Sequence, residues 1–288
     1  MEREAWSRIL PLVERLAPQT ANRRYAFDWS RIILVYLWAV LHDRPICWAC
    51  QAATWPDDLL PSRLPTPSTM TRRLRAACVI CTLNTLLRHM QRGQARGLVS
   101  IIDGKALPVG PHSRDPDARW GRGASGLAKG YKLHLIAGKN GRIEAWSIQP
   151  LNVDERVVAR RMVATTRLQG YLLGDAHFDD RHLYAGCRER GAQLVAPRGK
   201  PMRGLGHRLR DPSRMRAIDM LEQTHTHFGP QLMERRRDIE RRFGQLCSAA
   251  HGLPPLPAWV RRQPRVERWV TAKLLVHTIV RRQRARSA

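Results

Sequence analysis

The sequence predicts an α/β protein: an all-helical N-terminal part followed by a mixed sheet that is flanked by helices. Before about residue 97, apolar residues recur at the spacing of amphipathic helices. After that point, short apolar runs typical of strands alternate with helical segments. The chain has 288 residues, 43% of them hydrophobic, which is enough for one large or two ordinary domains with a core. We therefore expect a helical domain at residues 1–97 and an α/β domain at residues 98–288.

Helices are expected through most of the N-terminal domain. The first is amphipathic and covers Trp6 to Leu16. Asp28 is placed to cap the second, which is very apolar and ends before Pro45. After residues 46–54 and a proline-rich turn, Ser68 is the expected N-cap of a third helix.

This third helix carries several arginines and suggests a helix-turn-helix. A short helix, a turn and an arginine-bearing helix are the parts of that motif, whose second helix enters the major groove of double-stranded DNA. The residues that would then face DNA are Thr69, Thr71, Arg72, Arg73 and Arg75. The alternative is an ordinary helical bundle whose arginines face solvent.

The net charge favours a polyanionic partner. Lysine and arginine number 50 against 24 acidic residues, a formal charge of +26, and each phosphate that such a protein neutralises releases counterions. A basic insert at about residues 197–230 contributes to this excess, with Asp211 as the one acid between Arg198 and Arg216. The alternative is a generally basic protein from a GC-rich genome.

Four cysteines form two close pairs, Cys47 with Cys50 and Cys78 with Cys81, a spacing that a zinc site can use. Both pairs lie in apolar surroundings, and no glycine knuckle follows either one. We therefore expect buried thiols that bind no metal.

The chain shows no sign of a membrane or secretory protein. Its start lacks the basic beginning and the cleavage pattern of a signal peptide. The apolar run from Ile32 to Leu41 is too short for a membrane span. We expect a cytoplasmic protein, associated with the nucleoid if it binds DNA.

The second domain is predicted to be a series of strands and helices, with a loop at about residues 108–130. Asn140 and Gly141 form a turn signal between two strand-like runs and predict a hairpin. The expected strands are 98–102, 131–137, 143–148, 171–174 and 192–196. The expected helices are 152–168, 181–190, 231–250 and a C-terminal helix at about 266–284.

Acidic residues end two of these strands. Asp103 follows the first strand and Asp175 follows the fourth. Open α/β sheets form their sites at the carboxyl ends of strands, so the two acids converge if these strands are neighbours. Glu240, on a helix packed over that edge, would complete a cluster of three carboxylates. Such a cluster repels itself and needs cations, and hard oxygen ligands favour Mg²⁺ or Mn²⁺.

In these motifs the chain resembles the DDE transposases of insertion sequences, in the group named after insertion sequences four and five. The resemblance covers about residues 60–283, and it implies an RNase H-like catalytic core. Its motifs are VSIIDGK with Asp103, GYKLH at residues 130–134, Asn152 with Asp154, GDAHFDD with Asp175, and RRDIERRF with Arg236 and Glu240. The family often has Tyr seven residues before this glutamate and Lys seven after it, where this chain has Met233 and Cys247. Those two departures suggest a divergent subgroup or a decaying copy.

The resemblance implies a DNA transposase in which Asp103, Asp175 and Glu240 hold the metal and Arg236 contacts DNA. Metal-dependent cleavage at the ends of the element would free 3′-hydroxyls, which would then attack the target DNA. The partners would be terminal inverted repeats and target DNA, with a homodimer on DNA because two ends are cut together. The alternatives are a non-catalytic DNA-binding protein derived from a transposase and a hydrolytic metal-dependent nuclease.

Each of these residues also has a simpler interpretation. Asp103 would be a turn residue at the end of a strand, and Asp175 would cap the helix that follows it. Glu240 would be a solvated helix acid among arginines, with Arg236 as its ion-pair partner one turn away.

Overall fold

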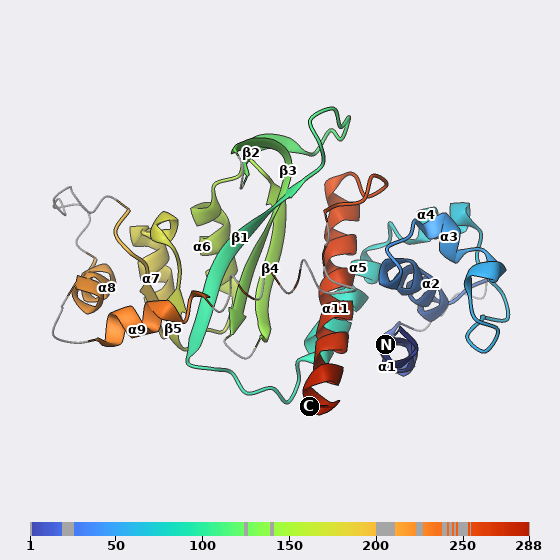
Figure 1. The fold of residues 1–288 in the computed structure, drawn as a ribbon, viewed down its shortest axis with the longest axis horizontal. Coiled ribbons are helices and arrows are strands. Elements are labelled where there is room, and N and C mark those ends of the chain that lie inside the picture. The colour runs from blue at the N-terminus through green and yellow to red at the C-terminus, as the bar shows by residue number, and fades with distance from the viewer. Residues whose placement is uncertain are drawn as a thin grey trace. The chain divides into compact units, whose positions relative to one another are not determined.

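The computed structural model describes residues 2–18, 26–123, 126–138, 141–199, 211–222, 227–237 and 255–287, together with residues 241, 244, 246 and 253. The chain divides into two compact units (Figure 1). The helical unit comprises residues 1–92 and 246–288, and the sheet unit comprises residues 93–245.

The helical unit is built around one apolar helix. Its elements are α1 (Glu2–Leu16), α2 (Trp29–Leu41), α3 (Ile46–Ala49), η1 (Ala52–Thr54), α4 (Pro67–Arg73), α5 (Ala77–Met90) and α11 (Gln263–Ser287). In α2, every residue from Ile32 to Leu41 is buried. A helix that is apolar all round has no solvent-facing side, so its neighbours must cover it completely. Trp38 of α2 stacks on Trp55 with ring centroids 4.5 Å apart, which extends this core.

The start of α2 is as predicted, whereas the start of α4 is not. Asp28 caps α2, and its Oδ1 accepts a hydrogen bond from the backbone N–H of Arg31 at 2.8 Å. The predicted cap of α4, Ser68, lies inside the helix. Thr66 is the cap instead, and its Oγ1 accepts from the backbone N–H of Thr69 at 3.3 Å. Pro67 explains the shift, because proline suits the first helical position and lacks the N–H that would remain unpaired there.

The C-terminal helix α11 belongs to the helical unit, although the sequence-based boundary at residue 97 assigned it to the α/β domain. It packs against α5, and also contacts α1 and α2. The buried ammonium of Lys273 on α11 forms an ion pair with Asp43, just after α2, at 2.7 Å. The helical unit is therefore formed from both ends of the chain.

The predicted burial of the cysteine pairs is wrong in part. Cys47 and Cys81 are exposed, and Cys50 and Cys78 are half-buried; all four are free thiols. None of the described helices combines the length and the apolar composition that a membrane span requires.

The sheet unit contains a mixed sheet, as predicted. Its strands are β1 (Val99–Pro108), β2 (Arg119–Gly123), β3 (Gly126–Gly138), β4 (Ile143–Pro150), β5 (Gly170–Leu173) and β6 (Ala192–Val195). Their order is β2-β3-β1-β5-β6, and β4 also pairs with β3. The pairs β1–β3, β2–β3 and β3–β4 are antiparallel, whereas β1–β5 and β5–β6 are parallel. The sheet therefore changes from antiparallel to parallel at β1.

Two of the sequence-based interpretations of this unit need correction. The expected loop at 108–130 contains β2 and the first part of β3. Part of the expected insert at 197–230 is helical, as α8 (Pro212–Glu222) and the first residues of α9 (Phe228–Glu234). The predicted hairpin is present as the β3–β4 pair; Asn140 of its turn lies outside the described residues.

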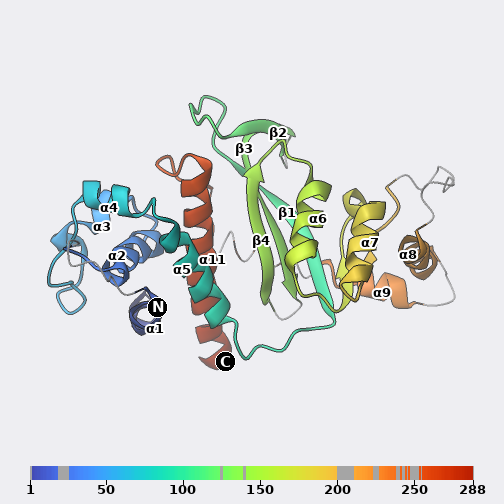
Figure 2. The same ribbon diagram turned by 180° about the vertical axis from the view of Figure 1, so that it is seen from behind.

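Helices α6 (Glu155–Thr165) and α7 (Arg181–Glu189) cover one face of the sheet, seen from that side in Figure 2. Ile102 of β1, Ile136 of β3 and Leu172 of β5 are buried against Met162 of α6 and Leu183 of α7. Branched apolar side chains on the strands and an apolar stripe on each helix provide this core. The packing fixes β1 and β5, the two strands that position the site.

Candidate active site in the sheet unit

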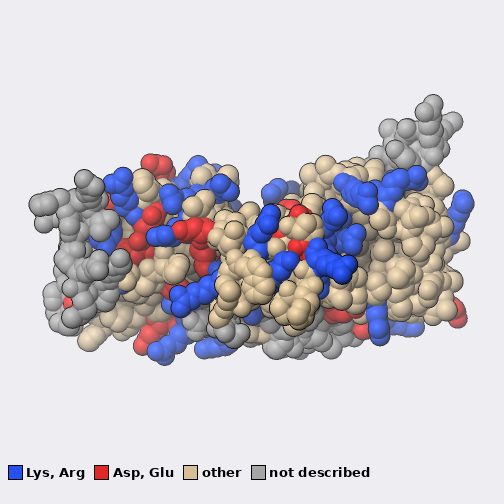
Figure 3. Space-filling view, turned by 90° about the horizontal axis from the view of Figure 1, so that it is seen from above, with Lys and Arg blue, Asp and Glu red and all other residues tan. Residues whose placement is uncertain are grey.

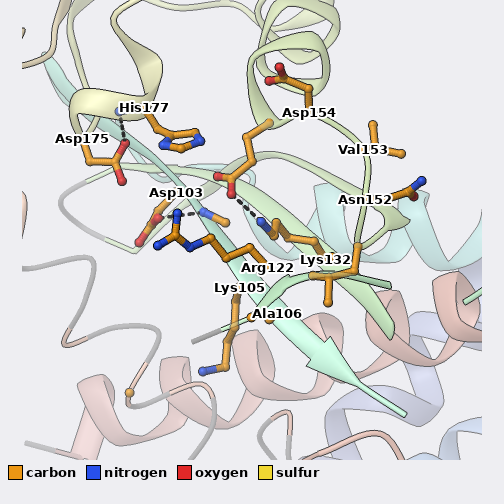
Figure 4. A pocket seen from close by; sticks show the side chains of 16 residues that line it. Asp103, Lys105, Ala106, Arg122, Lys132, Asn152, Val153, Asp154, Asp175 and His177 are labelled. Atoms are coloured by element: carbon orange, nitrogen blue, oxygen red, sulfur yellow. Dashed lines mark hydrogen bonds and ion pairs between the residues drawn. The ribbon is translucent and has the colours of Figure 1, made fainter. Parts of the chain in front are cut away.

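Two carboxylates line one pocket where β1 and β5 lie side by side. The parallel register pairs Ile101 with Leu173, and an acid follows each of these residues by two positions, Asp103 on β1 and Asp175 after β5. Both acids line a pocket of about 1000 Å³, shown in Figure 4. Asp103 does not end its strand as predicted, because β1 continues to Pro108 against β3. What ends near Asp103 is the parallel pairing with β5, which leaves space for the pocket.

Asp103 lies in an environment that disfavours its charge. Its Oδ1 accepts a hydrogen bond from the backbone N–H of Gly104 at 2.8 Å. Burial raises the pKa of Asp103 to about 6, and the charges of Asp175 and Glu155 add to the rise, while the Gly104 N–H and Arg236 oppose it. A cation in the pocket would stabilise the ionised carboxylate.

Asp175 is held in place by the turn that follows it. Its Oδ1 accepts from the backbone N–H of His177 at 2.8 Å and so caps the short helix η2 (Ala176–Phe178). The simpler interpretation, in which Asp175 caps the predicted helix at residues 181–190, is wrong, because Asp180 caps α7. Asp175 caps the short helix η2 instead. Capping does not remove Asp175 from the pocket, which it lines together with Asp103 and His177.

A buried ion pair anchors the segment after Asp175. The carboxylate of Asp179 accepts from Nε and Nη2 of Arg214 on α8, at 2.6 and 2.8 Å. It also accepts from the backbone N–H of Gly199 at 3.0 Å. Both charged side chains are less than a tenth exposed. The Asp179 carboxylate thus connects α8, and the segment after β6, to the loop that carries Asp175.

Lys132 and Glu155 form an ion pair in the same pocket, and sequence reasoning did not assign either of them to the site. Lys132 is on β3 and Glu155 is the first residue of α6. A Cβ atom at Gly104 would lie 2.9 Å from Oε2 of Glu155 and 3.1 Å from Cδ of Lys132. The glycine after Asp103 thus leaves room for this pair. The sequence signals were the lysine of GYKLH and the acid that follows Asp154, both within the motifs already noted.

Basic side chains line the pocket beside the acids. Lys105 of β1, Arg122 of β2 and Lys132 of β3 line the pocket from three strands. In Figure 4 the guanidinium of Arg122 lies next to Asp103, whereas the side chain of Lys105 extends away from the acids. Lysine and arginine are also more widespread than aspartate and glutamate on the face shown in Figure 3. Carboxylates surrounded by basic side chains suit a site that binds a cation and a polyanion together.

The third predicted carboxylate, Glu240, lies outside the described residues. Its described neighbours in the sequence reach the site: Gly244 lines the pocket, and the charge of Arg236 acts on Asp103. Among the residues that the structure describes, no cluster of three or more His, Cys, Asp or Glu side chains could hold a metal ion.

The predicted DNA-contact residues of the helical unit do not share one environment. Thr71, Arg72 and Arg75 are exposed and Thr69 is half-buried. Arg73 is only 6% exposed. Its guanidinium lies over the ring of Trp29 at 3.9 Å, and its Nη1 donates to the carbonyl of Phe27 at 3.1 Å. Arg73 therefore packs inside the helical unit, contrary to the prediction that it faces DNA.

The chain matches a protein-family model over most of its length. Residues 94–278, well over half of the chain, match the family described as the transposase DDE domain. The matched range includes Asp103, Asp175 and Glu240. Comparisons with curated proteins and with solved structures give no match.

Proposed function

The chain belongs to the DDE transposase family, and on this basis we propose that it cuts DNA at the ends of a mobile element and joins those ends to target DNA. The observation that carries this proposal is the placement of Asp103 and Asp175 in one pocket with basic walls. Asp103 on β1 and Asp175 just after the parallel strand β5 share this pocket with Lys105 and Arg122, so cation ligands and phosphate contacts lie in one place.

We further propose an RNase H-like core and membership of the group named after insertion sequences four and five. The strand order β4-β3-β1-β5-β6 supports the core. Its first three strands are antiparallel to one another, and β5 and β6 are both parallel to β1. The motifs around Asp103, Asp175 and Glu240 support the group.

Asp103, Asp175 and Glu240 are the proposed ligands of Mg²⁺ or Mn²⁺. These residues suit such an ion, because carboxylate oxygens are its preferred ligands. Burial beside other acids raises the pKa of Asp103 to about 6, so a bound cation would stabilise its ionised form. When bound, the metal would supply Lewis-acid stabilisation of the phosphodiester displacement. The placement of Glu240 is supported by Gly244 at the pocket and by the charge of Arg236 near Asp103.

Other side chains of the pocket would orient the DNA. Lys105 and Arg122 are placed to bind its phosphates, and Glu155 holds the ammonium of Lys132 in position. The bond from the His177 N–H to Asp175, and the bond from the Gly104 N–H to Asp103, fix the two carboxylates before substrate arrives. Catalysis would then depend on positioning and on neutralisation of charge.

The helical unit is the proposed DNA-binding unit, with Thr69, Thr71, Arg72 and Arg75 as contacts and Arg73 as a structural residue. Arg236 is proposed to contact DNA at the active site, where its charge reaches Asp103. We propose that a homodimer holds two terminal inverted repeats, because both ends of an element are cut together.

A strand-transfer assay tests this function. The purified protein is incubated with Mg²⁺, a duplex that carries the inverted repeats found beside its gene, and a supercoiled target plasmid. We expect nicks at the repeat ends and donor ends joined to the plasmid. Cleavage without joined products would show a hydrolytic nuclease, and binding without either reaction would show a non-catalytic DNA-binding protein.

A further inference from the structure

The helical unit contains another pocket, and the residues that line it are far in the sequence from Asp103 and Asp175. It has a volume of about 140 Å³ and lies among α2, the residues after α2, the end of α4 and the start of α11. Its polar lining comes mainly from Tyr36, Arg44, Arg75, Arg265, Arg268 and Trp269.

Several hydrogen-bond donors in this pocket lack a partner. The Tyr36 hydroxyl, Nε of Arg268 and Nε1 of Trp269 are buried and make no hydrogen bond within the described part of the chain. Tyr36 is 6% exposed and Trp269 is 3% exposed. Buried polar atoms are nearly always hydrogen-bonded, so three unpaired donors on side chains that line the same pocket point to an occupant there.

Each of these groups can donate a hydrogen bond, and the arginine and tryptophan N–H groups cannot accept one. Burial raises the pKa of Tyr36, against the opposing charges of Arg268 and Arg265, so the hydroxyl keeps its proton and can donate. The occupant must therefore present hydrogen-bond acceptors.

The pocket is also crowded with positive charge. Four arginines line it, and among its described lining residues there is no acidic side chain. Burial lowers the pKa of Arg268; Tyr36 and Glu267 act in the opposite direction, while the charges of Arg265 and Arg75 lower it further. An anionic occupant would relieve this repulsion.

The size of the pocket narrows the choice of anion. A water molecule takes about 30 Å³ of liquid, so 140 Å³ holds about four or five waters. That space suits one tetrahedral oxyanion and is too small for a whole nucleotide. Arginine guanidinium groups match phosphate in both charge and geometry.

We propose that this pocket binds a single phosphate group, and that on DNA the group is one backbone phosphate. The assignment of this phosphate to DNA rests on the proposed function, whereas the existence of an oxyanion site does not depend on it. Thr71 and Arg75, which the sequence placed among the DNA contacts, line the pocket together with residues of α11. One phosphate would thus be held jointly by α4 and the C-terminal helix.

The first arm of the test uses the whole protein and inorganic phosphate. Calorimetric titration measures the phosphate Kd at constant ionic strength for wild type, Arg268→Gln and Tyr36→Phe. Arg88→Gln on α5 is the control, because it removes the same charge from an exposed position outside the pocket. We expect Arg268→Gln to weaken phosphate binding at least tenfold, Tyr36→Phe to weaken it measurably, and Arg88→Gln to leave it unchanged. Equal phosphate binding by wild type and both pocket variants would overturn the proposal. So would the absence of phosphate binding by wild type.

The second arm replaces phosphate with duplex DNA and measures affinity over a range of salt concentrations. A lost phosphate contact reduces the slope of log K against log salt by about one unit. We expect that reduction for Arg268→Gln and not for Arg88→Gln. Identical slopes, with the phosphate result intact, would overturn the assignment to DNA and leave a site for a free oxyanion. Neither arm requires cleavage, so failure of the proposed transposase activity is separately visible.

Discussion

Asp103 on β1 and Asp175 after β5 line the same pocket, because the two strands are parallel neighbours and each acid follows the paired residues Ile101 and Leu173 by two positions. Residues 72 positions apart in the sequence are thereby placed together by strand register alone. The conformation of each acid is then fixed by one backbone N–H, that of Gly104 for Asp103 and that of His177 for Asp175.

His134 should make the protein less stable in acid. Burial, assisted by the charge of Lys132, lowers the pKa of this histidine to about 4 from 6.5. The unfolded chain therefore binds more protons than the folded chain between these pH values, and stability falls as pH is lowered through that window. The loss is up to about 3 kcal/mol. Urea unfolding of wild type and His134→Gln from pH 7 to pH 4 checks this, and parallel curves for the two proteins would contradict it.

Loss of the carboxylate of Glu155 should destabilise the sheet unit. Glu155→Gln leaves the ammonium of Lys132, whose side chain is only 10% exposed, without its ion-pair partner. We expect a loss of about 1–3 kcal/mol in the free energy of unfolding. Glu189→Gln, at an exposed position on α7, is the matched control and should change stability by less than about 0.5 kcal/mol. Equal effects of the two substitutions in chemical denaturation would show that the pair does not stabilise the fold.

Gly170→Ala should disrupt the start of β5, which positions Asp175. The new Cβ would lie 2.2 Å from the carbonyl oxygen of Leu98, and Gly170 has a φ of +70°. A backbone atom cannot move aside as a flexible side chain can, so we expect loss of soluble folded protein or a large fall in Tm. Gly186→Ala, in α7 with its nearest neighbour 3.8 Å away, should keep or raise Tm. A normal Tm for Gly170→Ala would refute the close approach of Gly170 to the Leu98 carbonyl.

Arg72 and Arg73 should respond differently to the same substitution. Arg73→Gln removes the guanidinium from the Trp29 ring and from the Phe27 carbonyl, so stability should fall by about 1–3 kcal/mol. Arg72→Gln, at an exposed position, should leave stability unchanged and weaken DNA binding, with a shallower salt dependence. Thermal unfolding and fluorescence anisotropy with labelled duplex separate the two effects. If the stability losses are reversed, the placement of α4 is wrong.

The convergence of Asp103 and Asp175 could be predicted from the sequence because it follows from two general rules. Short branched apolar runs predict buried strands, and neighbouring parallel strands place their carboxyl ends together. The capping of α2 by Asp28 could also be predicted, because capping is a local interaction.

Features that depend on long-range contacts could not be predicted from the sequence. The Lys132–Glu155 pair joins β3 to the first residue of α6, and local patterns do not specify how a helix is placed against a strand. The burial of Arg73 depends on Trp29, far away in the sequence. Strand β2, with the sequence RWGRG, lacks an apolar alternation because most of its side chains are exposed. The packing of α11 on α5 joins opposite ends of the chain, and no spacing of residues predicts that choice.

Metal-dependent cleavage by single-carboxylate variants tests the central claim most directly. Asp103→Asn, Asp175→Asn and Glu240→Gln each remove one proposed ligand charge at nearly constant shape. In Mg²⁺, each should lower the rate of cleavage of a repeat-end duplex by at least about 100-fold while DNA binding remains. Asp238→Asn is the control, because in a helix its side chain lies about 200° around the axis from residue 240 and so on another face; it should cleave normally. Cleavage at the wild-type rate by Glu240→Gln, or loss of cleavage in Asp238→Asn alone, would contradict the proposed set of three carboxylates.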